Sequence, residues 1–213
     1  MSQDNYLTPS QTVYKAYMRS YVSEEALRNF TCAMDKFFKK YNKEEKEEHN
    51  KLFIHDFLKE SFYHGTNAIN TSNDADYAIF ASEHSRNSFP VVLIEAKHVN
   101  NTSEMITVDN INKKALHEII LYYILEEEGK KNYNIKNLII TDGFHWFIFS
   151  KRVFLDTFIR DRKFVKQVMD MEKSHEYNRT DIYKKIIKKK VEEKLKRDKQ
   201  NKRTKIDREK YIK

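Results

Sequence analysis

Three charged residues lie at the ends of two neighbouring apolar segments of the chain. Residues 91–97 read Val-Val-Leu-Ile-Glu-Ala-Lys, and residues 76–80 read Asp-Tyr-Ala-Ile-Phe. Successive side chains of a strand point to opposite faces, so Glu95 and Lys97 share one face of the second segment. If the two segments pair as strands, Asp76 at the entrance of the first adds another carboxylate. Two carboxylates and one ammonium group are then expected to converge at a single point.

This combination suits metal-assisted hydrolysis of a phosphate ester. Carboxylate oxygens are ligands that Mg²⁺ prefers, and Mg²⁺ usually keeps several waters and takes further ligands from substrate phosphate. Lys97 cannot bind a metal while it is protonated. Its expected roles are to orient or deprotonate the attacking water and to offset negative charge in the transition state.

The alternative interpretation of these residues is structural. In a chain that is 34% charged, Glu-x-Lys triplets arise by chance, and residues 44–46 form one. Glu95 and Lys97 could then form an ion pair on an exposed strand face. A buried type of strand, however, rarely ends in two charges on the same face unless they are paired or used, which favours a functional site.

The elements that must position these residues alternate between helices and strands. Apolar spacing and capping residues predict helices from Thr8, from Ser23, over 43–62, from a cap at Asp109 to 127, and from 153 onwards. Strands are predicted around 67–71 and over 76–80, 91–97, 137–141 and 146–149, the last two joined by an Asp142-Gly143 turn. This order predicts an α/β fold with a mixed central sheet flanked by helices, a helical N-terminus and a basic helical C-terminal tail.

Composition excludes several other kinds of chemistry. Cys32 is the only cysteine and lies in an apolar pattern, so a buried packing residue is expected, with no disulfide and no cysteine-based zinc site. Three glycines provide no phosphate-binding loop or dinucleotide fingerprint. The chain has no apolar run near 18 residues and begins without the features of a signal peptide, so a cytoplasmic protein is expected. His117, on an apolar helix, is expected to be a hydrogen-bonded core residue.

The positive charge is concentrated in a tail. Residues 178–213 carry 16 Lys and Arg against 6 Asp and Glu, whereas residues 1–177 have a net charge of −2. We therefore divide the chain into a main domain, 1–177, and a basic tail, 178–213, that is helical or partly disordered. Such a tail suits the phosphate backbone of DNA, although a solvated helix is the alternative. The candidate DNA-binding residues are Lys188, Lys189, Lys190, Arg197 and Arg203, and a weak apolar stripe of Ile182, Ile186 and Val191 could pack on the body.

The pattern of Asp76 with Glu95-Ala96-Lys97 resembles the PD-(D/E)xK nuclease superfamily. More specifically, the chain resembles the N-terminal nuclease region of single-chain type IIG restriction-modification enzymes. The resemblance covers about residues 8–190 and is carried, beyond the triplet, by the ordered stretches 56–63, 92–97, 104–110, 115–123 and 138–149.

The resemblance implies Mg²⁺-dependent cleavage of double-stranded DNA, with Mn²⁺ able to substitute. It implies Asp76 and Glu95 as metal ligands and Lys97 as the catalytic lysine, and it leaves Glu48 or Glu47 to complete the site from the preceding helix. Many relatives carry glutamine where this chain has His117. The chain has only Pro9 and Pro90, hence no Asn-Pro-Pro-Tyr motif, so base methylation is not expected from these residues.

The missing methylation motif shapes the partners that we expect. They are double-stranded DNA, a separate methyltransferase or specificity subunit, and a second copy of the chain on DNA, because one site cuts one strand per encounter. The nuclease domain could also be inactive or nonspecific in isolation. The competing hypothesis is a catalytically silent DNA-binding or interaction module.

Overall fold

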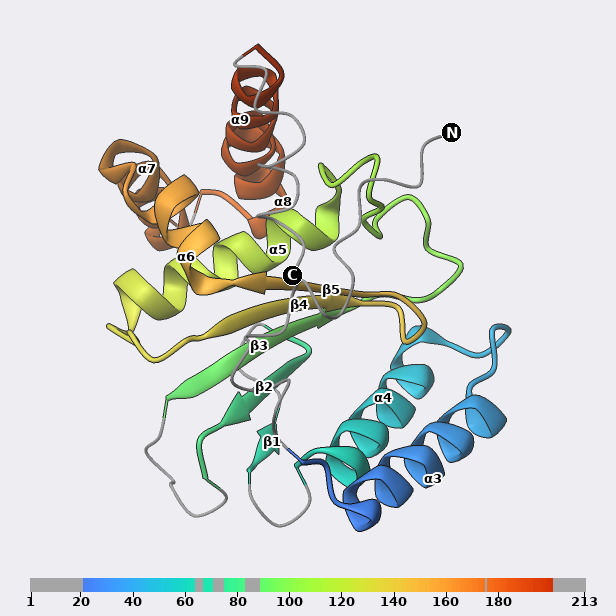
Figure 1. The fold of residues 1–213 in the computed structure, drawn as a ribbon. Coiled ribbons are helices and arrows are strands. Elements are labelled where there is room, and N and C mark those ends of the chain that lie inside the picture. Colours follow the sequence, from blue (N-terminus) through green and yellow to red (C-terminus); the bar gives the residue numbers. More distant parts are fainter. Residues whose placement is uncertain (1–20, 64–66, 71–74, 83–88, 175, 201–213) are drawn as a thin grey trace.

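A five-stranded mixed sheet lies between two layers of helices (Figure 1). The computed structural model describes residues 21–63, 67–70, 75–82, 89–174 and 176–200. The strands lie in the order of the chain: β1 (Ile69–Asn70), β2 (Tyr77–Phe80), β3 (Pro90–Ala96), β4 (Asn137–Thr141) and β5 (Trp146–Ser150). The predicted α/β class with a mixed sheet is confirmed.

The central strand β3 has one antiparallel and one parallel neighbour. It pairs antiparallel with β2, with Tyr77 opposite Ile94, and parallel with β4, with Ala96 opposite Thr141. Parallel neighbours need a crossover connection, which α5 (Lys114–Ile124) provides together with the π-helical segment η1 (Leu125–Gly129). The carboxyl ends of β3 and β4 therefore lie at the same edge of the sheet.

The helices divide between the two faces of the sheet (Figure 1). On one face lie α3 (Glu24–Lys40) and α4 (Glu47–Ser61). The opposite face is covered by α5 and by helices from the C-terminal half, which are α6 (Lys151–Phe154), η2 (Leu155–Ile159), α7 (Arg162–Lys173), α8 (Arg179–Ile182), η3 (Tyr183–Ile187) and α9 (Lys188–Gln200).

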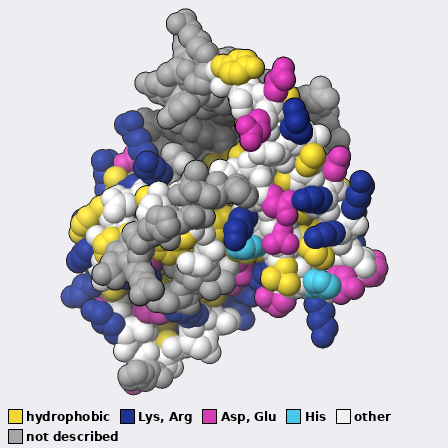
Figure 2. Space-filling model, turned by 90° about the horizontal axis from the view of Figure 1, so that it is seen from below, with side chains coloured by type: hydrophobic (Ala, Val, Ile, Leu, Met, Phe, Trp, Pro, Cys, Tyr) yellow, Lys and Arg dark blue, Asp and Glu magenta, His cyan; other side chains and the backbone are white. Residues whose placement is uncertain are grey.

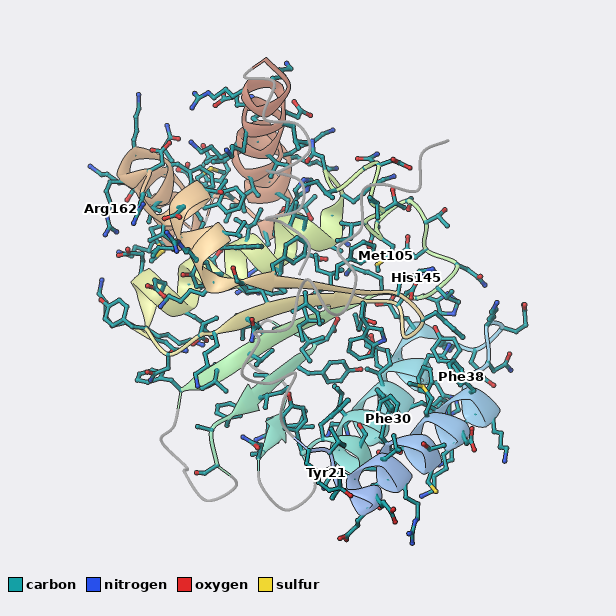
Figure 3. The ribbon with its side chains drawn as sticks, in the orientation of Figure 1. Tyr21, Phe30, Phe38, Met105, His145 and Arg162 are labelled. Atoms are coloured by element: carbon teal, nitrogen blue, oxygen red, sulfur yellow. The ribbon has the colours of Figure 1, made fainter. Side chains whose placement is uncertain are left out.

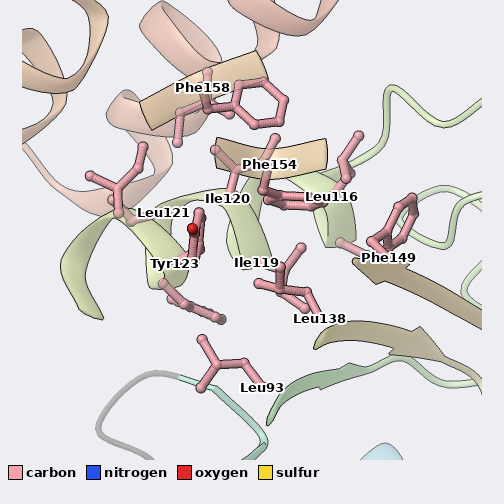
Figure 4. Packing of buried hydrophobic residues seen from close by; sticks show 14 of the residues in the cluster. Leu93, Leu116, Ile119, Ile120, Leu121, Tyr123, Leu138, Phe149, Phe154 and Phe158 are labelled. Carbon is pink, nitrogen blue, oxygen red and sulfur yellow. The ribbon is translucent and has the colours of Figure 1, made fainter. Parts of the chain in front are cut away.

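Each face of the sheet has its own hydrophobic core. Ile94 and Ala96 of β3 pack with α3 and α4, whereas Leu93 packs with α5. Figure 4 shows the second core, in which Leu93 and Leu138 face the apolar side of α5. This alternation places Glu95, two residues after Leu93, on the α5 face of the strand, as period two predicts.

The helix that follows the Glu-x-Lys strand begins later than predicted. Asp109 does not cap it; α5 starts at Lys114. Thr107 and Asn110 form a closed turn instead, in which each backbone N–H donates to the other residue's carbonyl at 3.0 and 3.1 Å. The Thr107 hydroxyl also accepts from the Asn110 N–H, and such local side-chain bonds compete with helix formation.

The first described helices differ from expectation in two details. Ser23 caps α3 as predicted, accepting the Ala26 N–H at 3.1 Å, but Cys32 is exposed, so the expectation of a buried cysteine is wrong. Ala33 and Phe37 face the core instead, and Phe38 is exposed (Figure 3). The next helix spans Glu47–Ser61 rather than 43–62. The helix predicted from Thr8 lies outside the described residues.

The first part of the basic tail belongs to the core of the protein. Ile182 and Val191 are buried as the predicted stripe requires, but Ile187 is buried in place of Ile186, which is half-buried. The π-helical segment η3 explains this shift, because its wider turn rotates the apolar face by about one residue. No helix among the described residues has the length and apolar character needed to cross a membrane.

One face of the molecule carries charged side chains of both signs. On the face shown in Figure 2, acidic and basic side chains are interspersed rather than segregated by sign. This agrees with the small net charge of residues 1–177.

Candidate active site

The ends of β2 and β3 bring together the three charged residues that the sequence singled out. Asp76 immediately precedes β2, and the pairing of Tyr77 with Ile94 places Asp76 beside Glu95. The Ala96 N–H donates to Asp76 Oδ2 at 2.8 Å, which fixes the aspartate against the end of β3. The Lys97 N–H donates to the Thr141 carbonyl at 2.9 Å, so the backbone of β3 is held on both sides.

Lys97 is buried between carboxylates from two elements. Its side chain is 6% exposed, and Nζ lies 2.6 Å from Glu95 Oε1 and 2.6 Å from Glu118 Oε2 on α5. Glu104 lies further away, at 3.9 Å. Burial alone would lower the pKa of Lys97, but the charges of Glu95 and Glu118 outweigh it and raise that pKa above its usual value. The exposed strand face of the structural alternative is therefore wrong, although the Glu95 ion pair exists.

Glu95 has the opposite electrostatic balance. The residue is 3% exposed. Its burial and the nearby negative charge of Asp76 raise the pKa of Glu95 well above its usual value, despite the opposing effect of Lys97. Burial thus opposes the negative charge on Glu95, and Lys97 is the neighbouring group that favours it.

The first two turns of α4 supply a fourth carboxylate and a second lysine. Lys51 Nζ lies 2.7 Å from Asp76 Oδ1 and 2.9 Å from Glu47 Oε1. Glu47 also accepts the His98 N–H through Oε2 at 3.2 Å, next to Lys97. Burial would raise the pKa of Glu47, but the hydrogen bond and charge of Lys51 lower it overall. The side chain of Glu48 is 84% exposed, so Glu47 is the glutamate of this helix that faces the site.

The oxygen-rich cluster fits a divalent cation in charge and donor type. Glu47, Asp76, Glu95 and Glu118 face three ammonium groups, those of Lys51, Lys97 and Lys114, the last 3.6 Å from Glu118 Oε1, which leaves a net charge of −1 when all are ionised. Hard carboxylate oxygens are suitable ligands for Mg²⁺. Within the described ranges, no three His, Cys, Asp or Glu side chains converge as a ready metal-binding group. The lysines lie between the carboxylates instead.

Sequence reasoning missed two members of this cluster. Glu118 is the one acidic residue of α5, a helix that is otherwise strongly apolar, and a charge in such a setting is a signal of a buried partner. Lys51 follows Glu47 by four residues, the spacing at which helical side chains meet. His117 behaves as predicted. It is buried and pairs through Nε2 with Asn112 Oδ1 at 2.6 Å. Burial, and to a smaller extent the charge of Lys188, lowers the pKa of His117 to about 4.

The candidate DNA-binding residues of the tail fall into three groups. Lys188, Lys189 and Arg197 are exposed on α9, the helix that continues η3. Lys190 is mostly buried, forms an ion pair with Asp161 and lies over a phenylalanine ring of α7, so it is a structural residue rather than a free cation. Arg203 lies outside the described residues.

Comparison with known proteins gives a family but no activity. Residues 7–212 match a family described as a domain of unknown function, DUF7149. The chain belongs to the DUF7149 family. No curated protein and no solved structure matches it. A function for this DUF7149 chain must therefore be inferred from the buried carboxylate and lysine cluster itself.

Proposed function

We propose that this chain is a Mg²⁺-dependent endonuclease domain that hydrolyses phosphodiester bonds in double-stranded DNA as part of a restriction-modification system. The observation that supports the proposal most directly is the meeting of Asp76, Glu95 and Lys97 at the ends of two paired strands. These residue types combine hard oxygen ligands with a cation that can stabilise a phosphate transition state. Mn²⁺ would replace Mg²⁺ in this role.

Each side chain has a distinct task in the proposed reaction. Asp76 and Glu95 would hold the Mg²⁺, and Glu47 would complete the set from α4. The bound metal would lower the pKa of a water and polarise the phosphate. The raised pKa of Lys97 keeps its ammonium group charged at neutral pH, so Lys97 would orient the water and offset phosphate charge rather than act as a free base.

Glu118 would act through Lys97. Its Oε2 atom lies 2.6 Å from Lys97 Nζ, and Glu118 reaches the lysine from α5. Two carboxylates on one ammonium group restrict its position more than Glu95 alone would. Glu118 is therefore a positioning residue, whereas Lys97 would meet the substrate.

The partners in this proposal follow from charge and from site number. Lys188, Lys189 and Arg197 are exposed cations that would contact DNA phosphates without reading sequence. One site per chain cuts one strand, so a double-strand break would need a second copy. Sequence recognition and methylation would come from a separate methyltransferase or specificity subunit.

The proposal is tested by nicking of supercoiled plasmid with Mg²⁺ or Mn²⁺. Wild-type protein should nick the plasmid, whereas Lys97→Ala and the near-isosteric Glu95→Gln should not. Lys151→Ala is the matched control, because Lys151 is also a partly buried lysine paired with a glutamate, Glu127, at 3.0 Å. Cleavage that persists in the Lys97→Ala protein would refute the mechanism.

The same assay distinguishes the second hypothesis, a catalytically silent DNA-binding module. The observation in its favour is that Lys51 and Lys97 already pair with the carboxylates of the cluster. A silent module would slow the migration of plasmid in a gel-shift assay but would leave the plasmid uncut with either metal. Binding without nicking by the wild-type chain would therefore replace the first function with the second.

A further inference from the structure

Lys51 lies among the carboxylates that would hold the metal. Its Nζ atom contacts Asp76 Oδ1 at 2.7 Å and Glu47 Oε1 at 2.9 Å, and Glu48 Oε1 at 3.2 Å. An ammonium group has three donors, so these three contacts use all of them. The side chain is only 14% exposed, which makes this a held arrangement rather than a loose surface pair.

The other oxygens of the same carboxylates are already used by the backbone. Asp76 Oδ2 accepts the Ala96 N–H, and Glu47 Oε2 accepts the His98 N–H. These two N–H groups flank Lys97, so the end of β3 orients both carboxylates. Of these four oxygens, the two without a backbone hydrogen bond are Asp76 Oδ1 and Glu47 Oε1, and these are the two that Lys51 contacts.

A divalent cation and the Lys51 ammonium group would therefore compete for the same oxygens. Two like charges on neighbouring positions repel each other strongly where water is scarce. Lys51 can leave without breaking the fold, because it is a flexible side chain in the first turns of α4 and its other contact, Glu48, is at the surface.

We infer that Lys51 is an internal counterion that holds Asp76 and Glu47 in place in the metal-free protein and is displaced when a divalent cation binds. Lys51 thereby sets the metal affinity of the site. This inference rests on the proposed function, since it needs the carboxylates to be metal ligands. It assigns to Lys51 a role separate from that of Lys97, which pairs with Glu95 and Glu118.

The experiment measures Mn²⁺ binding to the full chain by calorimetry, without substrate. Lys51→Met removes the charge and keeps most of the apolar stem, and Lys51→Gln is a second neutral variant that can still donate to Asp76. Both should bind Mn²⁺ about tenfold more tightly than wild type, a change of about 1.4 kcal/mol. Lys51→Arg keeps the charge and should bind no more tightly than wild type.

Lys36→Met is the matched control. Lys36 is also a helical lysine paired with a glutamate, Glu60, at 2.8 Å, but it lies on α3 among exposed residues. The Mn²⁺ affinity of the Lys36→Met protein should stay within about twofold of that of wild type. Circular dichroism of each variant would check that the fold is retained.

The outcomes separate this inference from the proposed function. Unchanged or weaker Mn²⁺ affinity in both neutral Lys51 variants would overturn the role of Lys51, while Lys97-dependent nicking by the wild type would leave the nuclease proposal standing. If neither wild type nor the Lys51 variants bind Mn²⁺, the inference is overturned. The absence of nicking as well would overturn the proposed function with it.

Discussion

Replacing Lys97 by methionine should destabilise the protein strongly, because it removes the ammonium group shared by two buried carboxylates. Glu95 and Glu118 are 3% and 7% exposed, and each lies 2.6 Å from Lys97 Nζ. At an effective dielectric constant of about 20, one such contact corresponds to an attraction of about 6 kcal/mol before desolvation is subtracted. Breaking a buried pair by removing one partner typically costs about 3–5 kcal/mol, which is the loss expected for Lys97→Met.

A double-mutant cycle with Glu118→Gln isolates the interaction from the loss of side-chain packing. In Lys97→Met, Glu95 has lost the ammonium group that it contacts and Glu118 keeps only Lys114, at 3.6 Å, whereas the double variant has one of these carboxylates instead of two. We therefore expect it to be more stable than the sum of the single changes implies, with a coupling of about 1–3 kcal/mol. The measurement is urea unfolding at pH 7, followed by circular dichroism, with the slope of the transition checked for each variant.

Two results would contradict this reasoning. A cost below about 1 kcal/mol for Lys97→Met would mean that the lysine is effectively solvated, like an ordinary surface pair. Additive single effects, with coupling below about 0.5 kcal/mol, would mean that Glu118 does not hold Lys97. Lys36→Met, which breaks an exposed pair with Glu60, provides the reference, and its urea midpoint should stay close to that of wild type.

Three further predictions concern other parts of the molecule. The pKa of His117 is lowered to about 4 in the fold, so below its unfolded value near 6.5 the unfolded chain binds a proton that the folded chain does not. Stability should then fall by up to about 3 kcal/mol between pH 6.5 and 4, and chemical unfolding of His117→Gln should show a correspondingly smaller fall. Gly143 has φ +89°, a conformation that strains any residue with a Cβ atom, so Gly143→Ala should lower stability by about 1–3 kcal/mol in thermal unfolding. An unchanged melting temperature would contradict this expected strain in the alanine variant. Neutralising the exposed Lys188, Lys189 and Arg197 together should weaken DNA binding. It should also reduce the slope of log affinity against log salt by about 0.9 for each phosphate that is no longer neutralised. An unchanged slope would argue against binding of DNA by these residues.

Deletion of the whole tail would be a poorer test of DNA binding than those point changes. Ile182, Ile187 and Val191 are buried in the larger hydrophobic core, so removing residues 178–213 would also expose that core. Weaker binding would then have two explanations. Changes restricted to exposed cations leave the packing intact.

The strands were predictable because their signals are local. An apolar segment with period two, bounded by polar residues, predicts β2 to β5 within one or two residues of the observed bounds. The start of α5 was not predictable in the same way. Asp109 is a residue type that caps helices, but the closed turn of Thr107 and Asn110 occupies the backbone groups that a helix beginning there would need. Residue type favours a cap, whereas the competition between turn and helix is decided by the chain around it.

The site divides along the same line between local and long-range information. Glu95 and Lys97 share a face because of strand geometry, and that much follows from two-residue spacing. The partners Lys51 and Glu118 come from helices on opposite faces of the sheet, and no local pattern brings residues 51 and 118 to the same strand end. The site therefore spans both helical layers, although its sequence signature lies in one strand.

The choice between Glu47 and Glu48 shows how one additional inference from periodicity could have extended the prediction. The buried face of α4 contains Asn50, Ile54 and Phe57, at the spacing of an amphipathic helix. Glu47 lies seven residues before Ile54, two turns along the same face, whereas Glu48 is rotated by about 100° towards solvent. The apolar positions of the helix were visible in the sequence. Projecting their face back to the first turn selects Glu47, the glutamate whose two oxygens the structure pairs with Lys51 and with the His98 N–H.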